Sequence, residues 1–420
     1  MTNHNIGQHS FCLMHLIDMN AFKNLYRRAR LNKKSLIVSA INAFVVFILC
    51  YTIDNLPYSF VGDATLGQRF DQVKQFVSSK DEDIPSDLLL INVAYDRELV
   101  DVTDDFGFPK GNIDITNRSK LLELLTRLNN SNYKYIVLDV SFSNEHKTEQ
   151  DSALFNLIHK MKRIVVAKSE KIETADSILL DKARYSDYST HISESNFVKY
   201  EYIRNGEPTL PYQIYLDLGG DEIHSFAGLY FFKGRLANKS IVLRYPIKIW
   251  NKYVLNSSSK IMAEPQYYNL GSDILDTDID TSSLTKDKIV VIGDFSENDI
   301  HDTYIGKIAG PIINLNAFYA LTNDNLSIPY TEIFFLLLLY FTISLFIMKE
   351  VSVNSLFPFV KKIKSKTFDF LLSFIGLSFS LSGISLLWYT LFDLDINILI
   401  PSLYFSIFGT IIKYRKTITS

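Results

Sequence analysis

Five ionisable residues stand where a fold could gather them into a site. Asp96, Asp139 and Asp294 lie at or just beyond the ends of short apolar runs, and Asp299 and His301 follow the last of these runs. Such side chains could bind a divalent metal ion or act as a general acid and base. Aspartate is also a common cap and turn residue after a strand, where it accepts backbone N–H groups. We expect a structural role first, ligand binding second and catalysis last. The candidates for ligand binding are Asp96, Asp139, Asp294, Asp299, His301 and Thr303.

Signatures of established catalytic sites are missing from the sequence. It contains no nucleophile elbow, Walker loop, HExxH motif or glycine-rich dinucleotide loop. Gly306 and Gly310 lie in YIGKIAGPI, which does not complete a phosphate-binding fingerprint and is better explained by a tight turn before a helix. Cys12 and Cys50 both precede the large middle region, so no disulfide framework or cysteine-based zinc site is expected there. We therefore expect a protein that is not an enzyme, with no catalytic residue, metal or cofactor.

The elements that must position these residues alternate between strand and helix. Apolar runs at 88–94, 135–140, 163–167 and 288–293 are typical of buried strands. Helices are predicted at 116–128, with Thr116 as a cap, at 150–161 and at 312–322. This alternation predicts an α/β domain with a mainly parallel sheet, whose binding crevice lies at the carboxyl ends of the strands. Residues 168–287 are irregular, with one clear strand at 241–245.

Four apolar runs predict transmembrane helices, at 35–53, 331–348, 368–392 and 396–412. The first run contains no charged residue, and at about 1.5 Å per residue it spans roughly 30 Å of hydrocarbon. The fourth is the shortest, and Pro401 lies near its start, where a helix tolerates proline best. The sequence thus predicts an integral membrane protein in contact with membrane lipid.

The basic residues beside these runs predict its orientation. Lysine and arginine cluster in the tail at 1–34, in the loop at 349–367 and in the tail at 413–420, and such clusters are retained in the cytoplasm. The acidic turn at 393–395 and the large region at 54–330 then lie outside. We expect a multi-pass protein of a bacterial inner membrane with both termini in the cytoplasm. The net charge of −3 gives no indication of nucleic-acid binding.

Several motifs follow one another along the chain. Asp96, Asp139 and Asp151 come in order, LRYP lies at 243–246, and KIVVIG is followed by DIHDTYIGKIAG. This order of motifs resembles the type-two CHASE domain, an extracellular sensory module associated with cyclases and histidine kinases. The closing stretch matches the pattern of the family at Asp299, Thr303, Gly306, Gly310, Asn316 and Ala317. One anchor before the domain and about three spans after it are similar too.

The resemblance implies an outer sensor domain that binds a ligand or an extracytoplasmic partner. Members of the family usually carry a cytoplasmic output domain after the last span, and 413–420 is too short to be one. We therefore expect a stand-alone member that passes the change to a separate cytoplasmic effector. A structural or assembly subunit of an envelope complex and a membrane-tethered enzyme are the alternatives.

The predicted orientation is testable by cysteine labelling. Single cysteines would be placed at Ser257, Ser355 and Asp393 in a background without Cys12 and Cys50, and intact cells would then be treated with an impermeant thiol reagent. We expect labelling at positions 257 and 393 only, because residue 355 lies in the basic loop. Labelling at position 355 would contradict the orientation.

Overall fold

The computed structural model of the chain divides into two compact units, and each is described by itself. One unit consists of Met1–Ile53 with Pro329–Ser420, and the other is Asp54–Ile328. The predicted segments at 1–31 and 350–365, the acidic turn at 393–395 and residues 244–246 of the LRYP stretch lie outside the described residues. The structure describes residues 32–56, 58, 73, 85–103, 106, 108–143, 147–169, 177–190, 197–243, 267–277, 279–296, 298–303, 306–349, 366–392 and 396–419.

Asp54–Ile328 is built around a six-stranded parallel sheet with the strand order β15-β1-β16-β4-β5-β6. The predicted runs form its four central strands, which are apolar up to their last residues because helices cover both faces. The prediction of an α/β domain with a parallel sheet is therefore confirmed. The strands are β15 (Tyr267–Asn269), β1 (Leu88–Asn92), β16 (Ile289–Gly293), β4 (Tyr135–Asp139), β5 (Ile164–Lys168) and β6 (Ala183–Tyr185).

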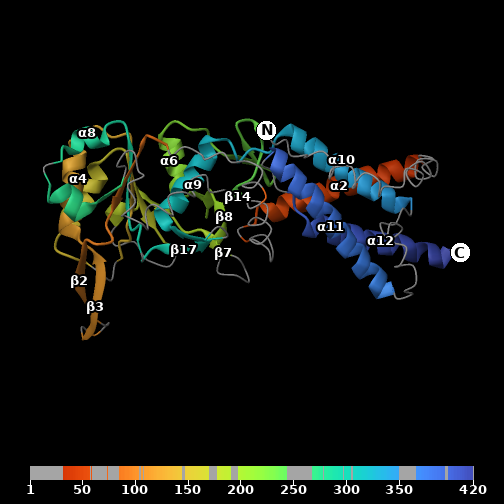
Figure 1. Ribbon diagram of the computed structural model, residues 1–420, viewed down its shortest axis with the longest axis horizontal. Coiled ribbons are helices and arrows are strands. Elements are labelled where there is room, and N and C mark those ends of the chain that lie inside the picture. Colours follow the sequence, from red (N-terminus) through yellow and green to blue (C-terminus); the bar gives the residue numbers. More distant parts are fainter. Residues whose placement is uncertain are drawn as a thin grey trace, which may run out of the picture. The chain divides into compact units, whose positions relative to one another are not determined.

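Helices cover the two faces of this sheet in separate hydrophobic clusters (Figure 1). Successive residues of β1 alternate between them: Leu89 lies in the cluster of Leu121 on α4, and Leu88 in that of Ile313 on α9. One cluster includes α4 (Arg118–Asn129), α5 (Asp151–Lys160), η2 (Ser177–Leu179), η3 (Leu270–Leu275) and α8 (Thr281–Thr285). The other includes α6 (Leu210–Asp217) and α9 (Gly310–Thr322).

The region predicted as irregular contains short strands. Two of them, β6 and β15, form the edges of the parallel sheet. A second sheet has the order β14-β8-β17-β18, with β7 also paired to β8, and its β14 corresponds to the strand predicted at 241–245. Its strands are β7 (Ser189–Thr190), β8 (Phe197–Glu201), β14 (Ser240–Val242), β17 (Ile300–Thr303) and β18 (Gly306–Ala309). The remaining strands here are β9 (Ile203–Arg204), β10 (Glu207–Pro208), β11 (His224–Phe226), β12 (Leu229–Phe232) and β13 (Arg235–Ala237).

Two helix starts differ from the sequence prediction. Asn117, rather than Thr116, caps α4, and its Oδ1 accepts the backbone N–H of Lys120 at 3.0 Å. Thr116 is wrong as the cap because it ends the strand β3, paired with Arg97. Helix α9 begins two residues before the predicted start, with Pro311 in its first turn, where proline is well tolerated.

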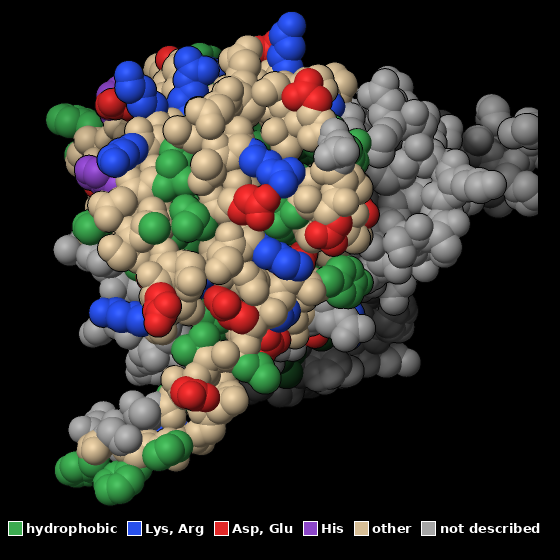
Figure 2. All heavy atoms as spheres, turned by 90° about the vertical axis from the view of Figure 1, so that its left-hand side faces the viewer, with side chains coloured by type: hydrophobic (Ala, Val, Ile, Leu, Met, Phe, Trp, Pro, Cys, Tyr) green, Lys and Arg blue, Asp and Glu red, His purple; other side chains and the backbone are tan. Residues whose placement is uncertain are grey.

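A hairpin arm was not predicted. Strands β2 (Arg97–Thr103) and β3 (Pro109–Thr116) pair antiparallel and project from the side of their unit (Figure 1). Phe106 and Phe108 at its tip are 87% and 68% exposed, and Figure 2 shows hydrophobic side chains gathered at the end of the arm. An apolar tip held away from the core is typical of a surface that meets a partner.

The other unit consists of helices. It contains α2 (Lys33–Asp54), α10 (Tyr330–Met348), α11 (Lys366–Phe392) and α12 (Leu399–Thr419). By length and composition, three helices among the described residues could cross a membrane: Lys33–Asp54, Tyr330–Met348 and Phe370–Thr390. The fourth predicted span falls on α12, where every stretch of 18 residues includes Lys413, Arg415 and Lys416, so α12 is not among them.

Polar side chains join these helices inside the unit. Asn42 of α2 donates to Ser344 Oγ of α10 at 2.9 Å and accepts from Tyr404 Oη of α12 at 2.8 Å. Ser344 and Ser402 are fully buried, which lets neighbouring backbones approach closely. The three helices are thus joined through one buried amide.

Candidate functional site

The candidate site begins at the carboxyl end of β4, in the centre of the parallel sheet. Asp139 ends this strand, and its Oδ2 accepts a hydrogen bond from Nδ2 of Asn314 on α9 at 2.9 Å. Tyr200 on β8 donates its hydroxyl to the other end of the same amide, Asn314 Oδ1, at 2.7 Å. Asn314 and Tyr200 are both buried. A buried amide therefore joins the parallel sheet, α9 and the second sheet.

A second carboxylate lies at the start of α9. Asp299 Oδ1 is 2.7 Å from Nε2 of His301, and the side chains of Asp299 and His301 are 36% and 38% exposed. The ring of Tyr188 meets that of His301 edge-on at 4.9 Å. Asp299 also packs on Gly310, whose N–H donates to the Asp299 carbonyl at 2.8 Å. A Cβ at position 310 would collide with the Asp299 carboxylate, so glycine is required at this close approach.

The two carboxylates interact electrostatically. Burial raises the pKa of Asp139 to about 7, and the negative charge of Asp299 adds to the rise, while Asn314 and His301 oppose it. Burial also raises the pKa of Asp299, against the hydrogen bond from His301. Two like charges beside a buried edge thus favour uptake of a proton near neutral pH. We call Asp139, Asp299, His301 and Asn314 the carboxylate cluster.

Asp294 lies close to the carboxylate cluster, one residue beyond β16, and its charge raises the pKa of Asp299. It is 7% exposed, and its Oδ1 accepts the backbone N–H of Ser296 at 2.8 Å. Its Oδ2 is buried and makes no hydrogen bond to any described residue. Asp294 therefore adds negative charge beside the cluster, with one carboxylate oxygen that has no hydrogen-bond partner among the described residues.

Asp96 and Thr303 serve contacts of their own. Asp96 is buried, and its carboxylate accepts Lys120 Nζ at 2.6 Å and the backbone N–H of Gly271 at 2.9 Å. Thr303 Oγ1 donates to the carbonyl of Gly306 at 2.6 Å, across the turn between β17 and β18. Of the predicted candidates, the structure brings together Asp139, Asp299 and His301, with Asp294 beside them.

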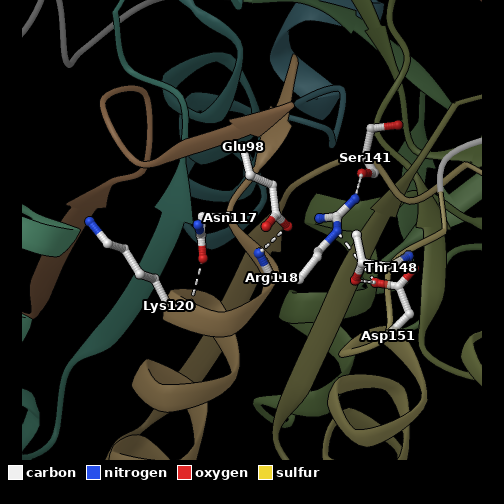
Figure 3. Close-up of polar contacts among 7 residues, drawn as sticks. All are labelled: Glu98, Asn117, Arg118, Lys120, Ser141, Thr148 and Asp151. Atoms are coloured by element: carbon white, nitrogen blue, oxygen red, sulfur yellow. Dashed lines mark hydrogen bonds and ion pairs between the residues drawn. The ribbon is translucent and has the colours of Figure 1, made fainter. Parts of the chain in front are cut away.

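A second charged group lies beside the N-termini of α4 and α5 (Figure 3). Arg118 is 1% exposed, its Nε lies 3.5 Å from Oδ1 of Asp151, and its Nη2 donates to the Ser141 carbonyl at 3.1 Å. Its guanidinium stacks over Phe142 at 4.4 Å. Burial lowers the pKa of Arg118 to about 10, against the charges of Asp151 and Glu98, so the guanidinium stays charged at neutral pH. Here opposite charges meet, in contrast to the carboxylate cluster.

Sequence reasoning missed the residues that hold the cluster together. Asn314, Tyr188 and Tyr200 come from α9, from the segment before β7 and from β8. A buried asparagine inside an apolar helix was the one signal available, because a polar side chain there needs partners. Tyrosines in an irregular region gave no comparable signal.

The arrangement suits reversible binding of a small cationic species or a proton. Two carboxylates and an imidazole could hold or move a proton. Among the described residues, no group of three or more histidine, cysteine, aspartate or glutamate side chains is arranged to hold a metal ion. The cluster lies at the sheet edge where open parallel sheets place their binding crevices.

One comparison with known proteins gives a match. A family model described as the CHASE2 domain matches residues 46–348. No curated protein and no solved structure matches the chain. The match covers the whole of Asp54–Ile328, including the carboxylate cluster.

The buried pair of Arg118 and Asp151 predicts a large stability effect. Asp151→Ala should lower the free energy of unfolding by about 3–5 kcal/mol, because it leaves the Arg118 charge buried without a partner. Denaturant unfolding of the purified chain would measure it. The double variant with Arg118→Met should lose less than Asp151→Ala alone. Glu123→Ala is the control, since it breaks an exposed pair with Arg127 on the same helix worth under about 1 kcal/mol. Equal losses in all three variants would contradict the assignment.

The role of Asp96 predicts a smaller effect. Asp96→Ala should destabilise the chain by about 1–3 kcal/mol, because the buried N–H of Gly271 loses its acceptor. Lys120 is 41% exposed and can turn to water, so its released charge adds little. The same unfolding experiment would measure this. An unchanged free energy of unfolding would show that Asp96 is free for another role.

Proposed function

The chain belongs to the CHASE2 domain family of sensory extracellular domains, and we propose that it is a membrane-anchored sensor whose outer domain binds its ligand at the carboxylate cluster. The bound state then alters the helices on either side of the domain, and a cytoplasmic effector responds. The outer domain binds its ligand and does not transform it. The single observation that supports this is the Asn314 bridge, which joins the cluster to the helix leading to α10.

One route from the cluster follows α9. Asn314 lies on α9, which ends at Thr322, and the chain reaches Tyr330, the start of α10, after seven residues, 323–329. This connection is held in place: Asp324 pairs with Arg235, and the backbone N–H of Ile328 donates to Leu236 at 2.7 Å. A displacement of α9 therefore reaches α10 through docked residues.

A second route runs through the second sheet. Tyr200, which donates to Asn314, lies opposite Ile241 of β14. Asn238 lies just before β14, and its Oδ1 accepts from Asn55 Nδ2 at 2.9 Å. Ser240, the first residue of β14, donates its Oγ to the Asp54 carbonyl at 3.2 Å. Asp54 ends α2. This route connects the cluster to the first apolar helix.

Both routes meet at Asn238. Its side chain bonds Asn55, after α2, and its backbone N–H donates to the carbonyl of Leu326, before α10, at 3.2 Å. A ligand that changes the second sheet therefore acts on both connections together. Such a device transmits a signal only if the ligand has different affinities for two states of the domain.

We also propose the orientation given by the basic clusters, with the outer domain across an inner membrane from the effector. A structural or assembly subunit is the second candidate, supported by the exposed apolar tip of the β2–β3 arm. A sensor needs the cluster for its output, whereas a scaffold needs only the arm. Substitution at the cluster therefore separates the two.

The proposal predicts that an insertion between α9 and α10 uncouples the outer domain from the helices that follow it. A photo-crosslinker placed at Ser355 would report cytoplasmic neighbours in native membranes. The crosslinks would be recorded for the chain with Asp139 and for the Asp139→Asn variant. Without an insertion, we expect the two crosslinking patterns to differ. About eight Gly and Ser residues inserted after Ile328 should reduce that difference, because they lie beyond the docked residues 324–328. An insertion after Asp324 would leave Ile328 docked on Leu236 and is the poorer choice.

The matched control is the same insertion between Asn205 and Gly206, in the turn between β9 and β10, which leaves both connections intact. It should preserve the difference between Asp139 and Asp139→Asn. If Asp139→Asn never changes the crosslinks, the cluster has no signalling role, and the scaffold becomes the better proposal.

A further inference from the structure

We propose that the ligand of the carboxylate cluster is the proton. It binds to Asp139 beside Asp299, and the side-chain amide of Asn314 reorients in response. This inference rests on the proposed sensory function and names the species sensed. The chemistry is simple: one proton leaves solvent, one O–H bond forms on Asp139, and the charge of the cluster rises by one. Nothing is oxidised and no group leaves.

The charges around Asp139 are mostly of one sign. The basic side chain that acts on Asp139 is His301, and it is already bonded to Asp299. Asp299 and Asp187 act on Asp139 with negative charge, and Asp294 acts on Asp299. The titratable and charged groups that face Asp139 are Asp299 and His301 at β17, Asp294 after β16, Asp187 before β7, Tyr200 on β8 and, through Tyr200, Arg204 on β9. Adding a proton relieves this excess of negative charge.

The hydrogen bonds of Asn314 can respond to protonation of Asp139. With Asp139 ionised, Tyr200 donates to Asn314 Oδ1, and Asn314 Nδ2 donates to Asp139 Oδ2. If Oδ2 takes the proton, it becomes a donor and requires an acceptor. Rotation of the amide supplies Oδ1 to Asp139 and turns Nδ2 towards the Tyr200 hydroxyl, which can also accept. The row of three groups thus reverses its direction when Asp139 Oδ2 takes the proton, and the hydrogen of the Tyr200 hydroxyl then turns away from Asn314.

The cluster also meets the requirement of access. Asp299 and His301 are each more than a third exposed, so protons reach the cluster from solvent. Asp139 is partly buried, which raises its pKa to about 7 with the help of Asp299. The two carboxylates therefore titrate as a pair, and the first proton taken up on acidification binds near neutral pH.

The effect on stability has a definite sign. The pKa of Asp139 is about 7 in the folded chain against 3.8 for an ordinary aspartate, so the folded state holds more protons between these values. The contribution of Asp139 to stability therefore falls as the pH rises from about 4 to about 7, and it is then constant. Asp139→Asn, which resembles the protonated form, should remove this dependence.

The test uses the full chain in lipid nanodiscs, with the proton as the probe. Infrared spectra from about pH 5 to about pH 9 would follow the carbonyl band of protonated carboxyl groups. We expect a band that titrates with a midpoint near 7 and is absent in Asp139→Asn. Asp299→Asn should move the midpoint down by about one pH unit, because it removes a like charge. Asp221→Asn, at an exposed carboxylate outside the cluster, should leave the midpoint unchanged.

Crosslinking at Ser355 in membranes, measured over the same pH range, completes the experiment. The inference is supported if the crosslinks change at the midpoint of the Asp139 band and if Asp299→Asn shifts both midpoints together. It is overturned if Asp139 stays ionised across this pH range, or if Asp139 titrates and the crosslinks do not change with pH. In either case, the crosslinks of the native chain and of Asp139→Asn can still differ from each other. That result would support the proposed sensory function with a ligand other than the proton.

Discussion

The burial of the parallel sheet on both faces is the constraint from which the site follows. Strands β1, β4 and β16 lie between two layers of helices, and almost every side chain along them is apolar. Polar groups within such a layer would lose water without gaining partners. Ionisable residues are therefore confined to the strand ends, and parallel strands bring those ends to one edge. Asp139 and Asp294 both lie at this edge, because Asp139 pairs in register with Gly293, the residue before Asp294.

The carboxylates at this edge of the sheet have two kinds of surroundings. Arg118 and Asp151 are buried as a pair of opposite sign, and Asp96 has both Lys120 and a backbone N–H. Each of these carboxylates has a cationic partner. Asp139 instead faces further carboxylates and accepts a hydrogen bond from the amide of Asn314. A structural site has little reason to retain uncompensated like charges, because they oppose folding. The contrast makes the carboxylate cluster the candidate for ligand binding at this edge.

The sequence was sufficient for the centre of the outer domain and insufficient for its periphery. Leu88–Asn92 and Ile289–Gly293 are continuous apolar runs, so their burial could be read from composition alone. Strands β6 and β15 have three residues each and follow no period, and pairing with distant strands defines them. The carboxylates were predictable as strand-end residues. Their grouping was not, because Asp139 meets Asn314 across 175 positions, and no local pattern encodes that distance.

Binding of a single proton supplies enough free energy to shift the domain between two states, and this free energy is too small to unfold it. If the pKa of Asp139 differs by one unit between two states of the domain, the coupling is about 1.4 kcal/mol, a tenfold change in their ratio. That is comparable to the net value of one or two buried hydrogen bonds such as those of Asn314, about 1 kcal/mol each. It is well below the total stability of a typical domain, about 5–15 kcal/mol. A network of a few polar contacts around Asn314 and Asn238 is therefore matched to its input. Stronger contacts would resist one proton, and an apolar contact in place of the amide would not distinguish Asp139 with its proton from Asp139 without it.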